Sequence, residues 1–146
     1  MQEYIPFIQE NLILVVAWVG LLLAIIVTVV KQRMAGYKYA TPSEATLLVN
    51  HHDALLIDVR NKDEFRSGHI AGSVHISAKD IRENNFAQIE SKKTTPIIVV
   101  CKAGQTAVGS ANLLIKAGFE QVHVLKDGLI AWNEAKLPLV NGKKKK

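Results

Sequence analysis

Two different hydrophobic patterns divide the chain. From position 12 to position 30 no side chain is charged, and Thr28 is the one polar residue in these 19 positions. As a helix rising about 1.5 Å per residue, the run is roughly 28 Å long, close to the roughly 30 Å hydrocarbon core of a bilayer. The pattern predicts one transmembrane helix over residues 12–30. After about position 41, short apolar runs alternate instead with segments of helical periodicity.

The charges that flank the apolar run predict its orientation. Lys31, Arg33 and Lys38 follow the run, and neither lysine nor arginine precedes it. The positive-inside rule therefore places the C-terminal part in the cytoplasm and the N-terminus outside. A cleavable signal peptide needs a basic start and a small-residue cleavage site, whereas this chain begins with Glu3 and Glu10 in its leading segment. We therefore expect a permanent anchor.

The part after the anchor has the pattern of an α/β fold. Thr41, Pro42 and Glu44 have the residue types of an N-cap, N1 and N3, so a helix is predicted from there to about Asn50. Strands are predicted at 54–59, 73–76, 97–101 and 121–125, and further helices at 79–88, 106–116 and 128–135. Apolar strands alternating with helices are typical of a parallel sheet that is covered on both faces.

Charge adds little to this picture. The formal net charge is +5, and the lysines at 143–146 contribute +4 of it. The predicted folded part is therefore nearly neutral, and it lacks a basic face with interleaved aromatic residues, so we expect no nucleic-acid partner. A lysine tail below a bilayer is either solvated or in contact with anionic lipid.

The chemistry suggested by the sequence centres on Cys101, the sole cysteine. It ends an apolar run and precedes Lys102 and Gly104, after which a helical pattern with small residues begins. Backbone amides of a tight loop and the positive end of a helix dipole both favour an anionic sulfur at such a junction. A single cysteine cannot form an intrachain disulfide, which agrees with a reducing compartment. The spacing therefore indicates a nucleophilic thiolate.

Two other cysteine or histidine chemistries fit less well. A cysteine-dependent phosphatase needs an arginine about six residues after the nucleophile to bind the transition-state oxygens, but Ala107 occupies that position. No arginine follows Cys101 at all. His51 and His52 are adjacent at a predicted helix end and lack further ligands at metal-binding spacing, so we expect no metal. They are predicted to face solvent.

Three further residues are assigned structural roles. Asp58 and Arg60 lie at a predicted strand end, followed by Asp63 and Glu64, and we expect them to form an ion-pair and hydrogen-bond network beside the sheet. His69 lies between Gly68 and an Ile-Ala-Gly sequence, where it is expected to fix a turn by hydrogen bonding rather than to act as a base.

Several of these segments together resemble the rhodanese family. The resemblance is carried by Asp-Val-Arg at 58–60, Asp-Glu-Phe at 63–65 and Gly-His-Ile-Ala-Gly-Ser-Val-His-Ile at 68–76. Val-Val-Cys at 99–101 with a glycine three residues later is similar to the active-site loop of that family, and Asp127-Gly128 with Trp132 resembles its closing motif. Combined with an N-terminal span, the chain is similar to the membrane-anchored single-domain rhodaneses of Gram-negative bacteria.

The resemblance implies a five-stranded parallel sheet flanked by helices and a thiosulfate:thiol sulfurtransferase activity. Cys101 would carry sulfane sulfur as a persulfide, passing it from a small donor to a thiol acceptor without a cofactor. The anion would be bound in a six-residue loop, with Lys102 as an auxiliary charge. The implied substrate-binding residues are Lys102, Ala103, Gly104, Gln105 and Thr106.

The hydropathy and charge patterns, together with the resemblance, give the expected organisation and location. We expect a short extracytoplasmic N-terminus (1–11), the transmembrane helix (12–30), a basic linker (31–38), the rhodanese domain (39–140) and a lysine-rich tail (141–146). The expected location is the bacterial inner membrane, crossed once, with the domain in the cytoplasm.

Two alternative functions remain at this point. Many active members of the family carry an arginine where this chain has Thr106, and this difference favours a non-catalytic adaptor that binds a membrane-protein partner. A reactive thiol of low pKa could alternatively sense redox conditions.

Overall fold

The computed structural model describes residues 10–34 and 36–142, which belong to two compact units, 1–35 and 36–146. The greater part of the expected N-terminal segment and the lysines of the tail lie outside the described residues. Each unit is considered separately below.

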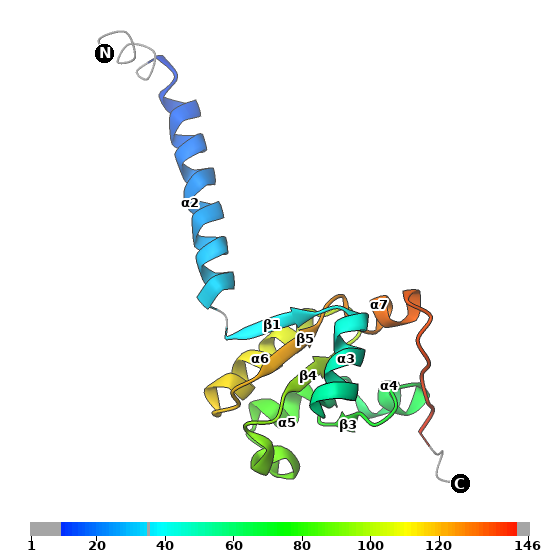
Figure 1. The fold of residues 1–146 in the computed structure, drawn as a ribbon. Coiled ribbons are helices and arrows are strands. Elements are labelled where there is room, and N and C mark those ends of the chain that lie inside the picture. The colour runs from blue at the N-terminus through cyan, green and yellow to red at the C-terminus, as the bar shows by residue number, and fades with distance from the viewer. Residues whose placement is uncertain (1–9, 35, 143–146) are drawn as a thin grey trace. The chain divides into compact units, whose positions relative to one another are not determined.

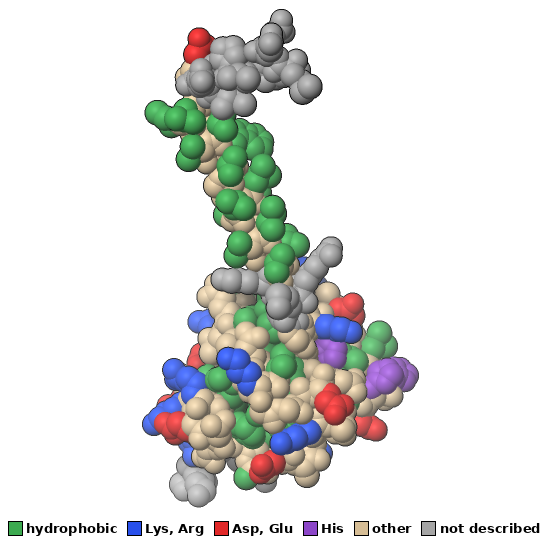
Figure 2. Space-filling model, turned by 90° about the vertical axis from the view of Figure 1, so that its left-hand side faces the viewer, with side chains coloured by type: hydrophobic (Ala, Val, Ile, Leu, Met, Phe, Trp, Pro, Cys, Tyr) green, Lys and Arg blue, Asp and Glu red, His purple; other side chains and the backbone are tan. Residues whose placement is uncertain are grey.

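The described residues of the first unit form one long helix, α2 (Leu12–Met34). Residues 12–30 have a mean hydropathy of 3.1, and large apolar side chains are exposed all along them. The visible side of this helix in Figure 2 is covered by apolar side chains. The predicted helix is therefore confirmed, and it is long and apolar enough either to cross a membrane or to act as a signal sequence.

The second unit is built on a five-stranded parallel sheet, as predicted (Figure 1). The strand order is β1-β5-β4-β2-β3, so the central strand β4 lies between β5 and β2. Its residues Ile97, Ile98, Val99 and Val100 are all buried. The strands are β1 (Tyr37–Ala40), β2 (Leu55–Asp58), β3 (Val74–His75), β4 (Ile97–Val100) and β5 (Val122–Leu125).

Helices cover both faces of the sheet and create two cores. One core lies between the sheet and α5, η1 and α6, with Ile81, Ile89 and Leu114 fully buried. The other lies against α3 and α7 and includes Ala45, Leu129 and Trp132. The helices are α3 (Pro42–His52), α4 (Lys62–Ser67), α5 (Ala78–Arg82), η1 (Ala87–Lys92), α6 (Gln105–Lys116) and α7 (Gly128–Glu134).

The first strand begins inside the segment 31–38 that the sequence predicted as a linker, and it ends inside the predicted domain. β1 begins at Tyr37 and pairs with β5, from Tyr37 opposite Val122 to Ala40 opposite Leu125. The compact unit that contains the sheet begins at Gly36. A four-residue edge strand with two exposed side chains is too short and too polar to show a strand period in the sequence.

The helix predicted at 79–88 is shorter than expected. α5 ends at Arg82, and Asn84 adopts a left-handed backbone conformation with φ of 55°. The amide of Asn85 then donates back to the carbonyl of Asp80, 2.8 Å away, which closes the turn before η1. Asparagine tolerates the left-handed region better than most residues, so the Asn84-Asn85 pair ends the helix.

One half-buried histidine, His123, lies at the centre of β5 between Lys38 of β1 and Ile98 of β4. Its Nδ1 atom is buried and has no hydrogen-bond partner among the described residues. Burial lowers the pKa of His123 below the ordinary value of 6.5, and the charge of Lys38 acts in the same direction. A hydrogen bond involving the Ile97 backbone and the charge of Glu44 oppose this shift without cancelling it.

Stability should therefore fall as the pH drops below about 6.5, because His123 then binds a proton more readily in the unfolded chain than in the folded chain. Substitution of His123 with glutamine should flatten the decline in melting temperature between about pH 7 and pH 5. The exposed His52 provides the control, since H52Q should keep the wild-type slope. Identical slopes for wild type and H123Q would contradict the assignment.

Candidate active site

Cys101 lies directly after β4, at the carboxyl end of the central strand, where parallel α/β sheets collect their reactive groups. The residue is 3% exposed, and its thiol is not part of a disulfide. The amide of Gly104 donates to the sulfur over 3.0 Å. Gly104 is also the N-cap of α6 and has a φ of 92°, a conformation that glycine adopts without strain.

The loop is tighter than the sequence predicted. The helix was expected to begin at Thr106 or Ala107, but α6 begins at Gln105. Gln105 and Thr106 therefore contribute first-turn amides of a helix, and these amides have no intrahelical acceptor. Among the described residues, no acceptor is bonded to the amides of Ala103, Gln105 or Thr106. The start of α6 consequently presents unpaired N–H groups at the same end of the sheet as the sulfur.

The carbonyl groups of the loop are held by the start of α7. The carbonyl of Cys101 accepts from the amide of Leu129 (2.9 Å), and that of Lys102 accepts from Ile130 (3.2 Å). The carbonyl oxygens of Cys101 and Lys102 are thus bonded to α7, whereas the Gly104 amide donates to the sulfur. This polarity favours an anion at Cys101.

Gly128 permits the close packing of α7 on the loop. A Cβ at this position would collide with the carbonyl oxygen of Cys101 and would lie 2.7 Å from the carbonyl carbon and oxygen of Lys102. Its φ of 59° is also in the left-handed region. Sequence reasoning placed Gly128 in a family motif but did not reveal this contact.

The predicted Asp58–Arg60 ion pair is present in the structure. Asp58 is 1% exposed, and Arg60 Nη2 lies 2.7 Å from its Oδ2, with Arg60 Nε 3.0 Å from Oδ1. Arg60 Nη2 also donates to the carbonyl of Gly68 over 2.7 Å. Glu64, which was expected in the same network, instead forms the capping box of α4 with Asn61. The pair thus ties the end of β2 to the end of α4.

His69 is held by contacts with a backbone carbonyl and an aromatic ring. Its Nδ1 lies 2.7 Å from the carbonyl of Phe65, and its ring stacks on Phe65 with centroids 3.8 Å apart. Its backbone also forms an isolated bridge with Val140. These contacts join the turn after α4 to the C-terminal segment.

The helix α3 extends two residues beyond its predicted end, so that His51 and His52 lie in its last turn, and both are exposed. Within residues 10–34 and 36–142, no group of three or more histidine, cysteine, aspartate or glutamate residues is arranged to hold a metal ion.

Hollows lie on two sides of the loop. Lys102, which is exposed, lines one of about 300 Å³ together with Arg60, Glu64 and Ile130. The other has about 570 Å³ and is called the edge groove here. It is lined by Tyr39, Ala103, Gly104, Gln105, Val108, Lys126 and Asp127.

Sequence reasoning assigned Tyr39, Val108, Lys126 and Asp127 to no site. Tyr39 lies on β1, and Lys126 and Asp127 follow the end of β5, the neighbour of β4. The signal that could have found Lys126 and Asp127 is their position after a strand, because the carboxyl ends of neighbouring parallel strands share one edge.

Comparison with known proteins decides the family. The model of the rhodanese-like domain matches residues 41–135. The chain belongs to the rhodanese-like domain family. The matched segment runs from the N-cap of α3 to the C-cap of α7 and includes Cys101 and its loop.

Relatives share both parts of the chain or the domain alone. The "Uncharacterized protein YibN" of Escherichia coli K12 is 45% identical over 143 residues, which cover 98% of this chain and 100% of the relative. The protein named thiosulfate sulfurtransferase GlpE of Pseudoalteromonas translucida is 30% identical over 100 residues, covering 68% of this chain and 92% of the relative. The match to YibN therefore includes the apolar segment, whereas the match to GlpE is about as long as one rhodanese-like domain.

The solved structures confirm the fold. A rhodanese-related protein from Thermoplasma volcanium superimposes with a TM-score of 0.61 at 23% identity, covering 71% of this chain and 98% of that protein. At this identity the likeness establishes the rhodanese fold.

Proposed function

We propose that this protein is a sulfurtransferase that carries sulfane sulfur on Cys101 as a persulfide. The observation that carries the proposal is the environment of the sulfur. The sulfur accepts a hydrogen bond from the Gly104 amide over 3.0 Å and lies at the same end of the sheet as the unpaired amides at the start of α6. The carbonyls of Cys101 and Lys102 are bonded to amides of α7. The relative named thiosulfate sulfurtransferase supports the same chemistry.

The first half-reaction loads the cysteine. The thiolate attacks the outer sulfur of a donor such as thiosulfate, an S–S bond forms at Cys101, and the S–S bond of the donor breaks. Sulfite leaves with the bonding electron pair. The enzyme begins and ends this step as an anion, so amides that bind negative charge serve both the thiolate and the persulfide.

The second half-reaction unloads it. The thiolate of an acceptor attacks the outer sulfur of the persulfide, and the electron pair of the broken S–S bond returns to Cys101 as thiolate. The acceptor leaves as a persulfide. No further oxidant or reductant is required, because the sulfane sulfur is transferred between two thiolates.

The charges around the loop suit a small anionic donor. Lys102 is exposed in the hollow beside the loop and supplies a cation there. Thr106 offers a hydroxyl and an amide but no guanidinium fork. We therefore assign donor binding to the amides of residues 102–106, with Lys102 as an auxiliary charge.

The apolar helix α2 supports a location at the membrane. We propose that it anchors the protein in the bacterial inner membrane as a single span with the domain in the cytoplasm. The lysine and arginine residues that follow the apolar segment support this arrangement.

Mass measurement of the loaded protein tests the proposed chemistry. The full chain in detergent, incubated with thiosulfate and freed of excess donor, should gain about 32 Da, one sulfur atom, on the peptide that contains Cys101. Treatment with dithiothreitol should remove this mass and release sulfide. C101S should gain none, because a hydroxyl is a far weaker nucleophile than a thiolate.

An unmodified wild-type protein, or equal gain by C101S, would overturn the proposal. If crosslinking in the bilayer then captured the same membrane protein with wild type and C101S, an adaptor role would replace it.

A further inference from the structure

We propose that the edge groove binds the sulfur acceptor, and that this acceptor is a small thiol carrying both an amino group and a carboxylate. The inference rests on the proposed function and names the class of its second substrate. Three features of the edge groove support it: its attachment to the cysteine loop, its pair of opposite charges, and its size.

The edge groove is built from the backbone that forms the cysteine loop. The amide of Lys126 donates to the carbonyl of Ala40 over 2.9 Å, which fixes the end of β5 to β1 beside Tyr39. The Asp127 amide nitrogen lies 3.3 Å from the position that a Cβ of Gly104 would occupy. Gly104, in turn, donates to the Cys101 sulfur. Gly104 therefore lies between the Cys101 sulfur and the side of the edge groove that is formed by Lys126 and Asp127.

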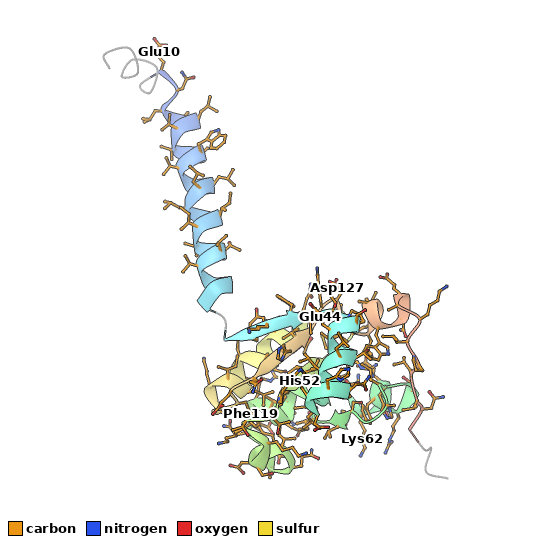
Figure 3. All side chains as sticks on the ribbon, viewed as in Figure 1. Glu10, Glu44, His52, Lys62, Phe119 and Asp127 are labelled. Carbon is orange, nitrogen blue, oxygen red and sulfur yellow. The ribbon has the colours of Figure 1, made fainter. Side chains whose placement is uncertain are left out.

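Lys126 and Asp127 place a cation and an anion on the same wall. Both are exposed, and among the described residues neither has a partner in an ion pair. Asp127 is the N-cap of α7, yet its side chain makes no capping hydrogen bond, so its carboxylate oxygens remain available. Figure 3 shows Asp127 at the outside of the domain.

The ammonium of Lys126 acts on nearby carboxylates. Hydrogen bonds from Thr41 are the main cause that lowers the pKa of Glu44, and the charge of Lys126 contributes to the same lowering. The charge of Lys126 is the smallest of the contributions to this lowering, and the same ammonium would attract the carboxylate of a ligand in the edge groove. An amino group that approaches Asp127 gains the complementary attraction.

Size and surface chemistry agree with a small organic thiol. A hollow of about 570 Å³ lies within the usual range of roughly 300–1,000 Å³ for small-ligand sites. Tyr39, 52% exposed, offers an aromatic surface, and Val108 an apolar one. A neutral thiol would leave the two charges of the wall unused, whereas an amino acid thiol or a short peptide thiol pairs with both.

The burial of Cys101 is compatible with transfer to a ligand beside the loop. The thiol is 3% exposed, but formation of the persulfide adds a sulfur about 2 Å beyond it. The acceptor has to reach this outer sulfur rather than the buried one. Recognition of its charged groups in the edge groove orients the thiol for this attack.

Steady-state kinetics of the full chain in detergent tests the proposal, with thiosulfate as donor and two acceptors. Glutathione carries both charged groups, and 2-mercaptoethanol carries neither. K126Q and D127N should each raise the KM for glutathione about tenfold, because each removes one charge-assisted hydrogen bond. The kcat with glutathione and both constants with 2-mercaptoethanol should stay within about twofold of wild type. K116Q, at the far end of α6, is the matched control and should leave the KM for glutathione unchanged.

Unchanged KM values for glutathione in both variants would overturn the proposal. An equal rise for both acceptors would do so as well, since it would indicate disturbance of the loop rather than loss of charge recognition. Binding of the unreactive S-methylglutathione, followed by calorimetry, gives a readout that does not need turnover, and K126Q and D127N should weaken it by the same factor. If wild type bound S-methylglutathione but never acquired a persulfide, the proposed function would fail and the ligand assignment of the edge groove would stand.

Discussion

Replacement of Arg60 with alanine should lower the free energy of unfolding by about 3–5 kcal/mol, the usual cost of removing one partner from a buried ion pair. Asp58 is 1% exposed and Arg60 10% exposed, and the carboxylate accepts from both Nε and Nη2 of the guanidinium. After the substitution, the buried carboxylate keeps the backbone amide of residue 60, 3.0 Å from Oδ1. The carbonyl of Gly68 also loses its donor.

Urea titration of the full chain in detergent, followed by the fluorescence of the buried Trp132, measures this loss. K79A is the control, because the Lys79–Glu83 pair is 3.9 Å long and its side chains are 73% and 60% exposed. That variant should change stability by no more than about 0.5 kcal/mol. A similar decrease in the free energy of unfolding in R60A and K79A would show that the buried Asp58–Arg60 pair stabilises the fold no more than an exposed pair does.

Replacement of Gly128 with alanine should destabilise the domain by about 2–4 kcal/mol and slow the loading of sulfur on Cys101. The estimate combines about 1–3 kcal/mol for overpacking with about 1 kcal/mol for a non-glycine residue in the left-handed region. The added methyl group would meet backbone atoms of Cys101 and Lys102, which cannot rotate away as a side chain can. The loop and α7 must then separate, and the hydrogen bonds from Leu129 and Ile130 are strained.

Gly109 offers a control of opposite sign. It lies within α6, and a Cβ there would meet nothing within 4 Å. G109A should therefore stabilise the protein by up to about 1 kcal/mol through helix propensity and leave loading intact. Rates of mass gain with thiosulfate, together with urea titration, distinguish the two variants. A G128A protein that loads at the wild-type rate would show that packing of α7 on the loop is dispensable.

The sequence predicted the sheet and the place of the cysteine because both depend on local patterns. The buried strand at 97–100 is a continuous apolar run, and Thr41 with Glu44 forms the capping box that its residue types indicate. Cys101 follows the central strand, as the junction of an apolar run with a helical pattern predicted.

The features missed from the sequence depend on pairing and packing between distant segments. β1 is a strand because β5 pairs with it, and its own four residues carry no strand period. The contacts between α7 and the cysteine loop connect residues 128–130 to residues 101 and 102 through backbone atoms. A pattern of side chains in the sequence does not indicate such contacts. The edge groove likewise joins Tyr39 to Lys126 and Asp127 across two strands.

The packing of α7 against the cysteine loop also bears on biosynthesis. Residues 128–130 are among the last of the domain to leave the ribosome, and they hold the carbonyls of Cys101 and Lys102 in place. When the strand that precedes Cys101 has left the ribosome, α7 has not yet emerged, so the cysteine loop still lacks the helix that holds its carbonyls. The reactive sulfur thus acquires its surroundings late in translation, and a transcript truncated after codon 126 would encode all five strands without a finished centre.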